Sequence, residues 1–130
     1  MSVSSQTSKI VSDNERAVRE HISNLLVSAF EGGSNYWYMI EDHNKSEVPE
    51  CEFLSQLLAC EGGKMLISDN AGQLDAPKWV HHVDTSKAWY TFTHDPQYAR
   101  HYGNLLQEND DAETGDVFLQ LVVFGEVIFG

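Results

Sequence analysis

Five carboxylates gather between residues 108 and 116, where they could imitate the phosphates of nucleic acid for a basic partner. They are Glu108, Asp110, Asp111, Glu113 and Asp116. A helix is predicted to begin near Ala112, and acids at a helix start are favoured by the helix dipole. That effect accounts for Asp110, Asp111 and Glu113, whereas Asp116 lies past the first turn. The spacing lacks the alternating ligands and the glycine of a calcium-binding EF-hand loop. The sequence therefore predicts a partner-binding row made of these five carboxylates.

A second candidate site is the turn between the first helix and the first strand. Its proposed ligand-binding residues are Glu31, Ser34, Asn35, Tyr36 and Tyr38. Around Trp37 the aromatic side chains alternate on a predicted strand, so one face can stack against a nucleotide-like ligand. A helix-to-strand corner fixed by Gly32 and Gly33 explains the same residues, since aromatic side chains belong to cores more often than to ligand platforms. The turn is therefore the alternative site, for a small ligand.

The thiol and imidazole groups show no spacing typical of catalysis or metal binding. Cys51 and Cys60 lie in a predicted helix, which places their α-carbons about 13 Å apart at about 1.5 Å per residue. That separation is beyond disulfide reach, so both are expected to be reduced and structural. His82, Asp84 and His94 match no recognised zinc spacing. The chain also lacks a nucleophile elbow, a phosphate-binding glycine loop and a Cys-x-x-Cys motif. We therefore expect no catalytic residue, no metal site and no cofactor.

Length and charge restrict the class of protein further. The 130 residues suit one domain, and 42% hydrophobic residues suffice for a core. A formal net charge of -12 disfavours direct contact with nucleic acid or anionic membranes and favours basic protein surfaces. No run of apolar residues is long enough to cross a membrane. Residues 1–10 are polar and rich in serine, so we predict a mobile tail there and a single domain over 11–130.

The hydrophobic periodicity predicts the elements that must position these residues. Helices are predicted at 14–30, 50–61, 96–106 and 112–124. Strands are predicted at 36–41, 64–68, 79–83 and 89–92. The expected fold class is α+β, with about four helices packed on a small, mainly antiparallel sheet. The last helix is apolar nearly all round, which predicts a place in the core or at a subunit interface.

Two blocks of the sequence carry a resemblance to a known group of proteins. Residues 29–38 read Ala-Phe-Glu-Gly-Gly-Ser-Asn-Tyr-Trp-Tyr, and residues 109–125 read Asn-Asp-Asp-Ala-Glu-Thr-Gly-Asp-Val-Phe-Leu-Gln-Leu-Val-Val-Phe-Gly. Both resemble blocks of small uncharacterised proteins of tailed bacteriophages and prophages. The resemblance implies a phage origin, life in the host cytoplasm and a role in host takeover or counter-defence. It implies no catalytic residues.

These observations lead to one functional expectation and one alternative. We expect an acidic binding protein, not an enzyme, that inhibits a basic, nucleic-acid-handling host protein. The alternative is a small-ligand binder or sponge that uses the Glu31–Tyr38 turn. The sequence also predicts that the two blocks meet, with Trp37 near Phe118 or Leu121. The apolar last helix and the tail Glu126–Gly130 further predict a homodimer.

Overall fold

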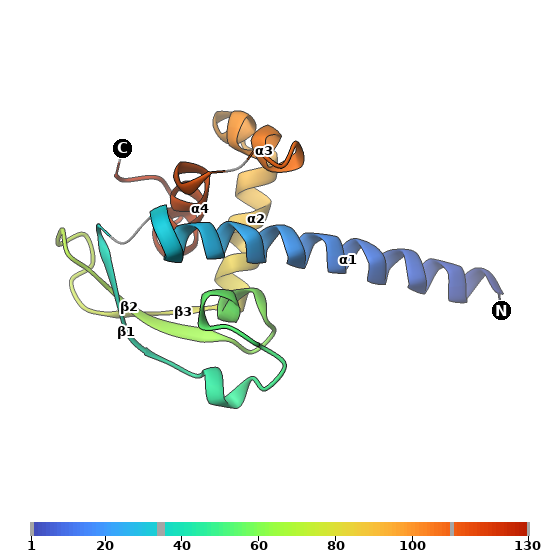
Figure 1. Cartoon of the computed structure of the whole chain (residues 1–130), viewed down its shortest axis with the longest axis horizontal. Helices are drawn as coiled ribbons and strands as arrows, with labels where there is room; N and C mark the ends of the chain where they lie inside the picture. Colours follow the sequence, from blue (N-terminus) through green and yellow to red (C-terminus); the bar gives the residue numbers. More distant parts are fainter. Residues whose placement is uncertain (1, 34–35, 110, 130) are drawn as a thin grey trace.

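Helices cover one face of a small antiparallel sheet, and Figure 1 shows the long helix α1 crossing in front of α2 and α4. The computed structural model describes residues 2–33, 36–109 and 111–129, without the side chains of residues 2–14 and 33. The main helices are α1 (Ser2–Ser28), α2 (His82–His94), α3 (Ala99–Leu106) and α4 (Ala112–Phe124). The strands are β1 (Tyr38–His43), β2 (Lys64–Asp69) and β3 (Lys78–His81), in the order β1-β2-β3. The predicted α+β class is confirmed.

The helix α1 is longer at its N-terminus than the sequence predicts. It begins at Ser2 rather than near Asn14, and so runs through the residues expected to form a tail. In Figure 1 this N-terminal part extends away from the other elements. The predicted apolar stripe is confirmed where side chains are described, because Ile22, Leu25 and Leu26 are buried. A π-helical turn, Ala29–Gly33, follows α1 and leads to the aromatic residues.

The sheet buries one face and leaves the other open. Met65 and Ile67 of β2 and Val80 of β3 are fully buried, and β2 confirms the strand predicted at 64–68. On the opposite face Leu66 pairs with Trp79, and the Lys64 ammonium lies 4.7 Å from the Trp79 ring centroid. The strand β1 begins at Tyr38 rather than at Tyr36.

Residues 82–94 form the helix α2, so the predicted strand at 89–92 and the turn before it are wrong. The Asp84 carboxylate accepts a hydrogen bond from the backbone N–H of His81 at 2.9 Å, which supports the first turn of the helix. Thr85, Ala88 and Phe92 are buried at helical spacing along one side of α2. The run Trp-Tyr-Thr-Phe-Thr has the composition of a strand, but this spacing and the helix start decide the outcome.

The predicted helix over 50–61 is also wrong. Only Leu54–Ala59 is helical, as a 3₁₀ helix, and Phe53 before it has extended backbone. Leu57 and Leu58 are fully buried, so the segment is anchored in the core by a short turn instead of a long helical face. Cys51 therefore lies outside the helical turn, and the separation of about 13 Å that a regular helix would give does not apply.

The helix α4 forms the centre of the core. Asp111 caps its start, accepting a hydrogen bond from the Thr114 backbone N–H at 3.0 Å, and Gly125 closes it with a φ of 78°. Every residue from Thr114 to Val123 is buried within this one chain. The apolar surface that favoured a homodimer is thus covered inside the domain, and the homodimer stays a prediction without that support. Among the described residues, no helix has the length and apolar character needed to cross a membrane.

Candidate functional site

Asp116 is buried and forms a polar connection between the two ends of the domain. Only 8% of the residue is exposed. Its carboxylate accepts hydrogen bonds from the Tyr36 hydroxyl at 2.8 Å, the Trp37 indole N–H at 2.8 Å and the Gln120 amide at 2.9 Å. A buried carboxylate requires such donors, and here the aromatic turn supplies two of them. Asp116 therefore lies inside the domain and not on an exposed row, and its role in partner binding stays a prediction without support from its position.

Gln120 extends this connection to the C-terminal segment. Its side-chain oxygen accepts hydrogen bonds from the backbone N–H groups of Ile128 and Phe129, both at 2.8 Å. The Phe129 ring then packs on Trp37, with ring centroids 5.5 Å apart. The Gln120 and Phe129 side chains thus hold the segment after α4 to the domain, through contacts that the sequence did not predict.

The two sequence blocks do meet, as predicted, but through other residues. The fully buried Trp37 contacts Asp116 and the Phe124 ring, which lies 5.2 Å away, where the sequence predicted Phe118 or Leu121. Tyr36 remains 55% exposed. Burial of its hydroxyl, followed by the hydrogen bond to Asp116, raises the pKa of Tyr36 to about 12. Tyr36 therefore belongs to this polar connection and not to an open ligand platform.

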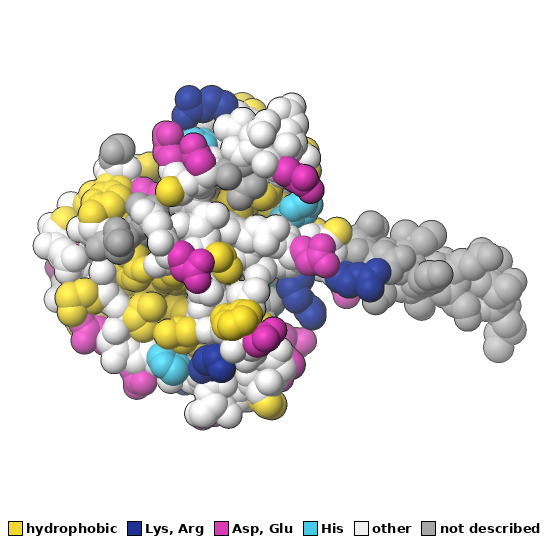
Figure 2. Space-filling view, viewed as in Figure 1, with side chains coloured by type: hydrophobic (Ala, Val, Ile, Leu, Met, Phe, Trp, Pro, Cys, Tyr) yellow, Lys and Arg dark blue, Asp and Glu magenta, His cyan; other side chains and the backbone are white. Residues whose placement is uncertain are grey.

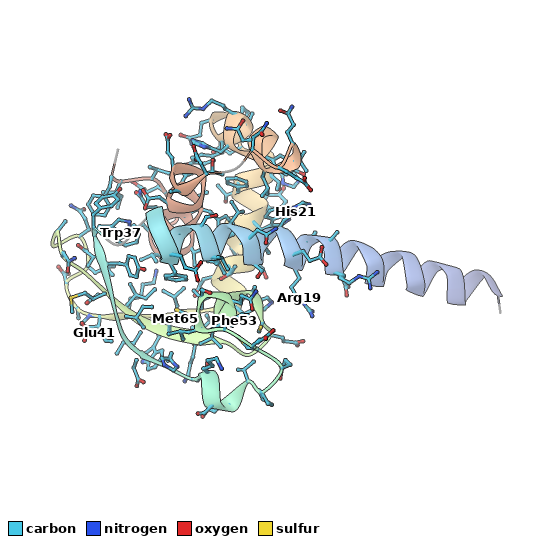
Figure 3. The ribbon with its side chains drawn as sticks, viewed as in Figure 1. Arg19, His21, Trp37, Glu41, Phe53 and Met65 are labelled. Carbon is cyan, nitrogen blue, oxygen red and sulfur yellow. The ribbon has the colours of Figure 1, made fainter. Side chains whose placement is uncertain are left out.

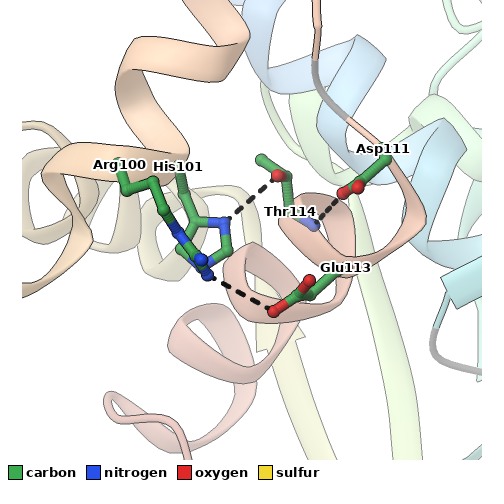
Figure 4. Close-up of polar contacts among 5 residues, drawn as sticks. All are labelled: Arg100, His101, Asp111, Glu113 and Thr114. Carbon is green, nitrogen blue, oxygen red and sulfur yellow. Dashed lines mark hydrogen bonds and ion pairs between the residues drawn. The ribbon is translucent and has the colours of Figure 1, made fainter.

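The remaining carboxylates of the predicted row that the structure describes are exposed, and two of them have structural roles. The backbone N–H of Thr114 holds the pKa of the capping residue Asp111 below its usual value. Glu113 lies 3.5 Å from the Arg100 guanidinium, and Figure 4 shows this pair beside the cap. Glu108 is exposed, with a positive φ of 58°, and Asp110 lies outside the described residues. The row is thus reduced to exposed charges at one helix start.

Figure 4 also shows His101 turned toward α4, an arrangement that the sequence did not predict. Its Nδ1 lies 3.2 Å from the Thr114 hydroxyl and its Nε2 lies 3.4 Å from the Arg100 guanidinium. Burial, followed by the Arg100 charge, lowers the pKa of His101, so the neutral ring is favoured. The contact between His101 and Thr114 links α3 to α4. Because the Thr114 hydroxyl is fully buried, this pair has no access to a substrate.

An aromatic hollow of about 350 Å³ brings together part of the predicted ligand turn. It is lined by Phe30, Glu31, Tyr38, Ile40, Phe53 and Leu54, with Ser55 at its edge. The Phe30 and Tyr38 rings meet edge to face at 5.4 Å, and 56% of Phe53 is exposed. Burial raises the pKa of the Tyr38 hydroxyl. Figure 2 shows apolar side chains gathered over this part of the surface, and Figure 3 shows Phe53 at its lower side.

The aromatic hollow confirms the proximity of only some predicted ligand residues. Glu31 and Tyr38 line it, whereas Tyr36 lies with Asp116. Ser34 and Asn35 lie outside the described residues. Phe53 was not predicted as a site residue. Its place in the predicted helix at 50–61 gave no indication that it would lie near the Glu31–Tyr38 turn. None of the residues that line the hollow is Lys or Arg.

An acidic hollow of about 380 Å³ lies between α1 and the segment 50–61. Four carboxylates line it, from Glu20, Glu50, Glu52 and Glu61, together with one guanidinium, from Arg19. All four glutamates are exposed. The segment 50–61 therefore contributes to both hollows, with Glu52 in the acidic one and Phe53 in the aromatic one. The acidic residues of 50–61 can be identified in the sequence, but their position beside α1 cannot be predicted from it.

Neither a metal site nor a known relative defines the chemistry of these hollows. Within the described parts of the chain, no group of three or more His, Cys, Asp or Glu side chains is placed to hold a metal ion. Models of known protein families, curated proteins and solved structures give no match to this chain. The resemblance of the two blocks to phage proteins stays a prediction.

Proposed function

We propose that the protein is an acidic binding protein that occupies a basic surface of a nucleic-acid-handling host protein. The supporting observation is that one short segment, 50–61, lines both an acidic hollow and an aromatic hollow. Exposed carboxylates attract and orient a basic partner, whereas an apolar pocket at the centre of an interface supplies most of the affinity. From the phage resemblance, we further propose that this happens in the cytoplasm of an infected bacterium.

The arrangement favours a protein partner over nucleic acid for a physical reason. The net charge of -12 repels a polyanion. Among the residues lining the two hollows, Arg19 is the sole cation, and it has four carboxylates around it. A surface that normally holds DNA or RNA has the opposite charge and often exposes apolar groups, so the partner's own nucleic acid should compete for it.

Two variants of equal charge test where the partner binds. One replaces Glu50, Glu52 and Glu61 with Gln, and the other replaces Glu108 with Gln, Asp111 with Asn and Glu113 with Gln. Both remove three acidic groups, and Asn at position 111 can still cap α4. We expect the first variant to bind a purified basic partner about tenfold more weakly and the second to change affinity less than threefold, because contacts at the site exceed the general charge effect.

The measurement is the dissociation constant at several salt concentrations, on a partner first isolated by affinity capture from a bacterial lysate. Affinity should fall as salt rises, because screening shortens from about 10 Å at 0.1 M to about 3 Å at 1 M. Equal weakening in both variants would show that total charge, and not the acidic hollow, controls binding. A larger loss of affinity in the second variant would indicate that the partner binds the predicted row of carboxylates at 108–113.

A small-ligand function remains the second candidate, because Glu31 and Tyr38 of the predicted turn line one hollow. Its lining carries no cation, which favours an uncharged or cationic aromatic molecule over a phosphorylated one. In this case Tyr38→Ala should abolish ligand capture. Tyr36→Ala should have little effect, because Tyr36 faces Asp116. Mass spectrometry of small molecules released from the heat-denatured protein, wild type and both variants, would decide this.

A further inference from the structure

The two cysteines of the chain share the acidic hollow, although the sequence predicted them to be far apart. Cys51 is buried, with 3% exposed, and Cys60 is half-buried at the end of the 3₁₀ helix. The short helix turns the chain back on itself, so both residues line the same hollow. Each thiol also donates to a carbonyl oxygen of this segment, Cys51 to Phe53 at 3.0 Å and Cys60 to Gln56 at 3.6 Å.

The two thiols are also close enough to affect each other. Burial raises the pKa of the Cys60 thiol to about 11, and the hydrogen bond with the Cys51 thiol adds to the rise. Glu50 acts in the same direction, whereas Arg19 opposes it. At neutral pH Cys60 is therefore mostly protonated and reacts slowly, so the pair stays as two thiols until an oxidant is supplied.

We propose that Cys51 and Cys60 form an oxidation site, at which a small-molecule disulfide converts the two thiols into one intramolecular disulfide. The more exposed thiol, Cys60, loses its proton and attacks the oxidant, which releases one thiol and leaves a mixed disulfide on Cys60. Cys51 then loses its proton and attacks the Cys60 sulfur, which releases the second thiol. The protein loses two protons and two electrons, and the oxidant takes up both to give two thiols.

The structure favours this product over two separate mixed disulfides. Cys51 is almost closed to solvent, so an oxidant reaches it poorly, whereas the more exposed Cys60 lines the same hollow as Cys51. The new bond closes a loop that contains Phe53 and Leu54, and so it fixes one wall of the aromatic hollow. The chemistry is independent of what that hollow binds.

The test measures how strongly the fold holds the two thiols together. The full chain is equilibrated with mixtures of reduced and oxidised glutathione, in native buffer and in urea, and remaining thiols are alkylated and counted by intact mass and peptide mapping. We expect both thiols to be lost together, without bound glutathione. The effective concentration of the pair should be roughly tenfold or more higher in the folded chain than in urea, because the fold holds both residues in place.

Several outcomes would overturn the proposal. These are equal effective concentrations in native buffer and urea, glutathione retained as the main product, disulfides between chains, or two thiols that stay reduced. Cys60→Ser, which changes the less buried cysteine, should lose the intramolecular product completely and keep the Cys51 thiol. Loss of the Cys51 thiol to a mixed disulfide in the folded variant, as fast as in urea, would contradict the protection that the structure assigns to Cys51.

Discussion

Replacing Trp37 with alanine is expected to lower the free energy of unfolding by about 3–5 kcal/mol, the range found for large truncations in well-packed cores. The Trp37 ring is 1% exposed and packs against Phe124 and Phe129. Its indole N–H also donates to the buried Asp116 carboxylate at 2.8 Å. The substitution therefore creates a cavity and removes one donor from a buried charge, so both effects act in the same direction.

Urea unfolding followed by circular dichroism measures this loss, and Trp37→Phe separates its two causes. Phenylalanine keeps most of the ring contacts but removes the N–H group, so we expect a smaller loss of about 1–3 kcal/mol. A change within about 0.5 kcal/mol for Trp37→Ala would place the side chain at the surface and contradict the packing described here.

The second large effect is expected at Gly115, where α4 crosses α1 without room for a side chain. A Cβ at this position would lie 2.7 Å from the Ala29 backbone nitrogen and 2.8 Å from the Leu25 carbonyl oxygen. Backbone atoms of a packed helix cannot yield as a flexible side chain does. We therefore expect Gly115→Ala to destabilise the protein by about 1–3 kcal/mol, despite the better helix propensity of alanine.

Gly103→Ala is the matched control, because it makes the same change in another helix. Nothing lies within 4 Å of a Cβ at Gly103, so alanine should raise stability by about 0.5–1 kcal/mol through its helix propensity. Thermal and urea unfolding of the two variants should therefore shift in opposite directions. Shifts of the same sign would mean that α1 and α4 do not approach each other closely at Gly115.

Local patterns predicted the last helix better than the middle of the chain. Asp111 and Gly125 are strong start and stop signals, and α4 lies between them as predicted. The segments 50–61 and 82–94 carry weaker local signals, and tertiary contacts decide their structure. At 50–61 the two buried leucines need only a short 3₁₀ helix to reach the core, so no longer helix forms.

The candidate site was harder to predict because it depends on residues far apart in sequence. Tyr38 and Glu31 were identified from one turn, but Phe53 completes the aromatic hollow from another segment. Asp116 was assigned to the surface because its charge is unusual in a core. Two of its donors, Tyr36 and Trp37, are about eighty positions away, a separation at which sequence periodicity gives no information.

The central claim is that charge and an apolar anchor act together on the surface formed by the two hollows. Fluorescence anisotropy with two synthetic peptides tests it most directly. Both peptides carry the same number of arginines, and one carries a single tryptophan where the other carries glycine. Each is titrated with the wild type and with Phe53→Ser, a change at a side chain that is 56% exposed and outside the buried core.

For the wild type we expect the tryptophan peptide to bind about tenfold more tightly, a difference of about 1.4 kcal/mol. Binding of both peptides should weaken as salt rises. Phe53→Ser should remove the preference for tryptophan and leave the salt dependence unchanged. Equal binding of the two peptides to the wild type, or a tryptophan preference that survives in Phe53→Ser, would contradict the account.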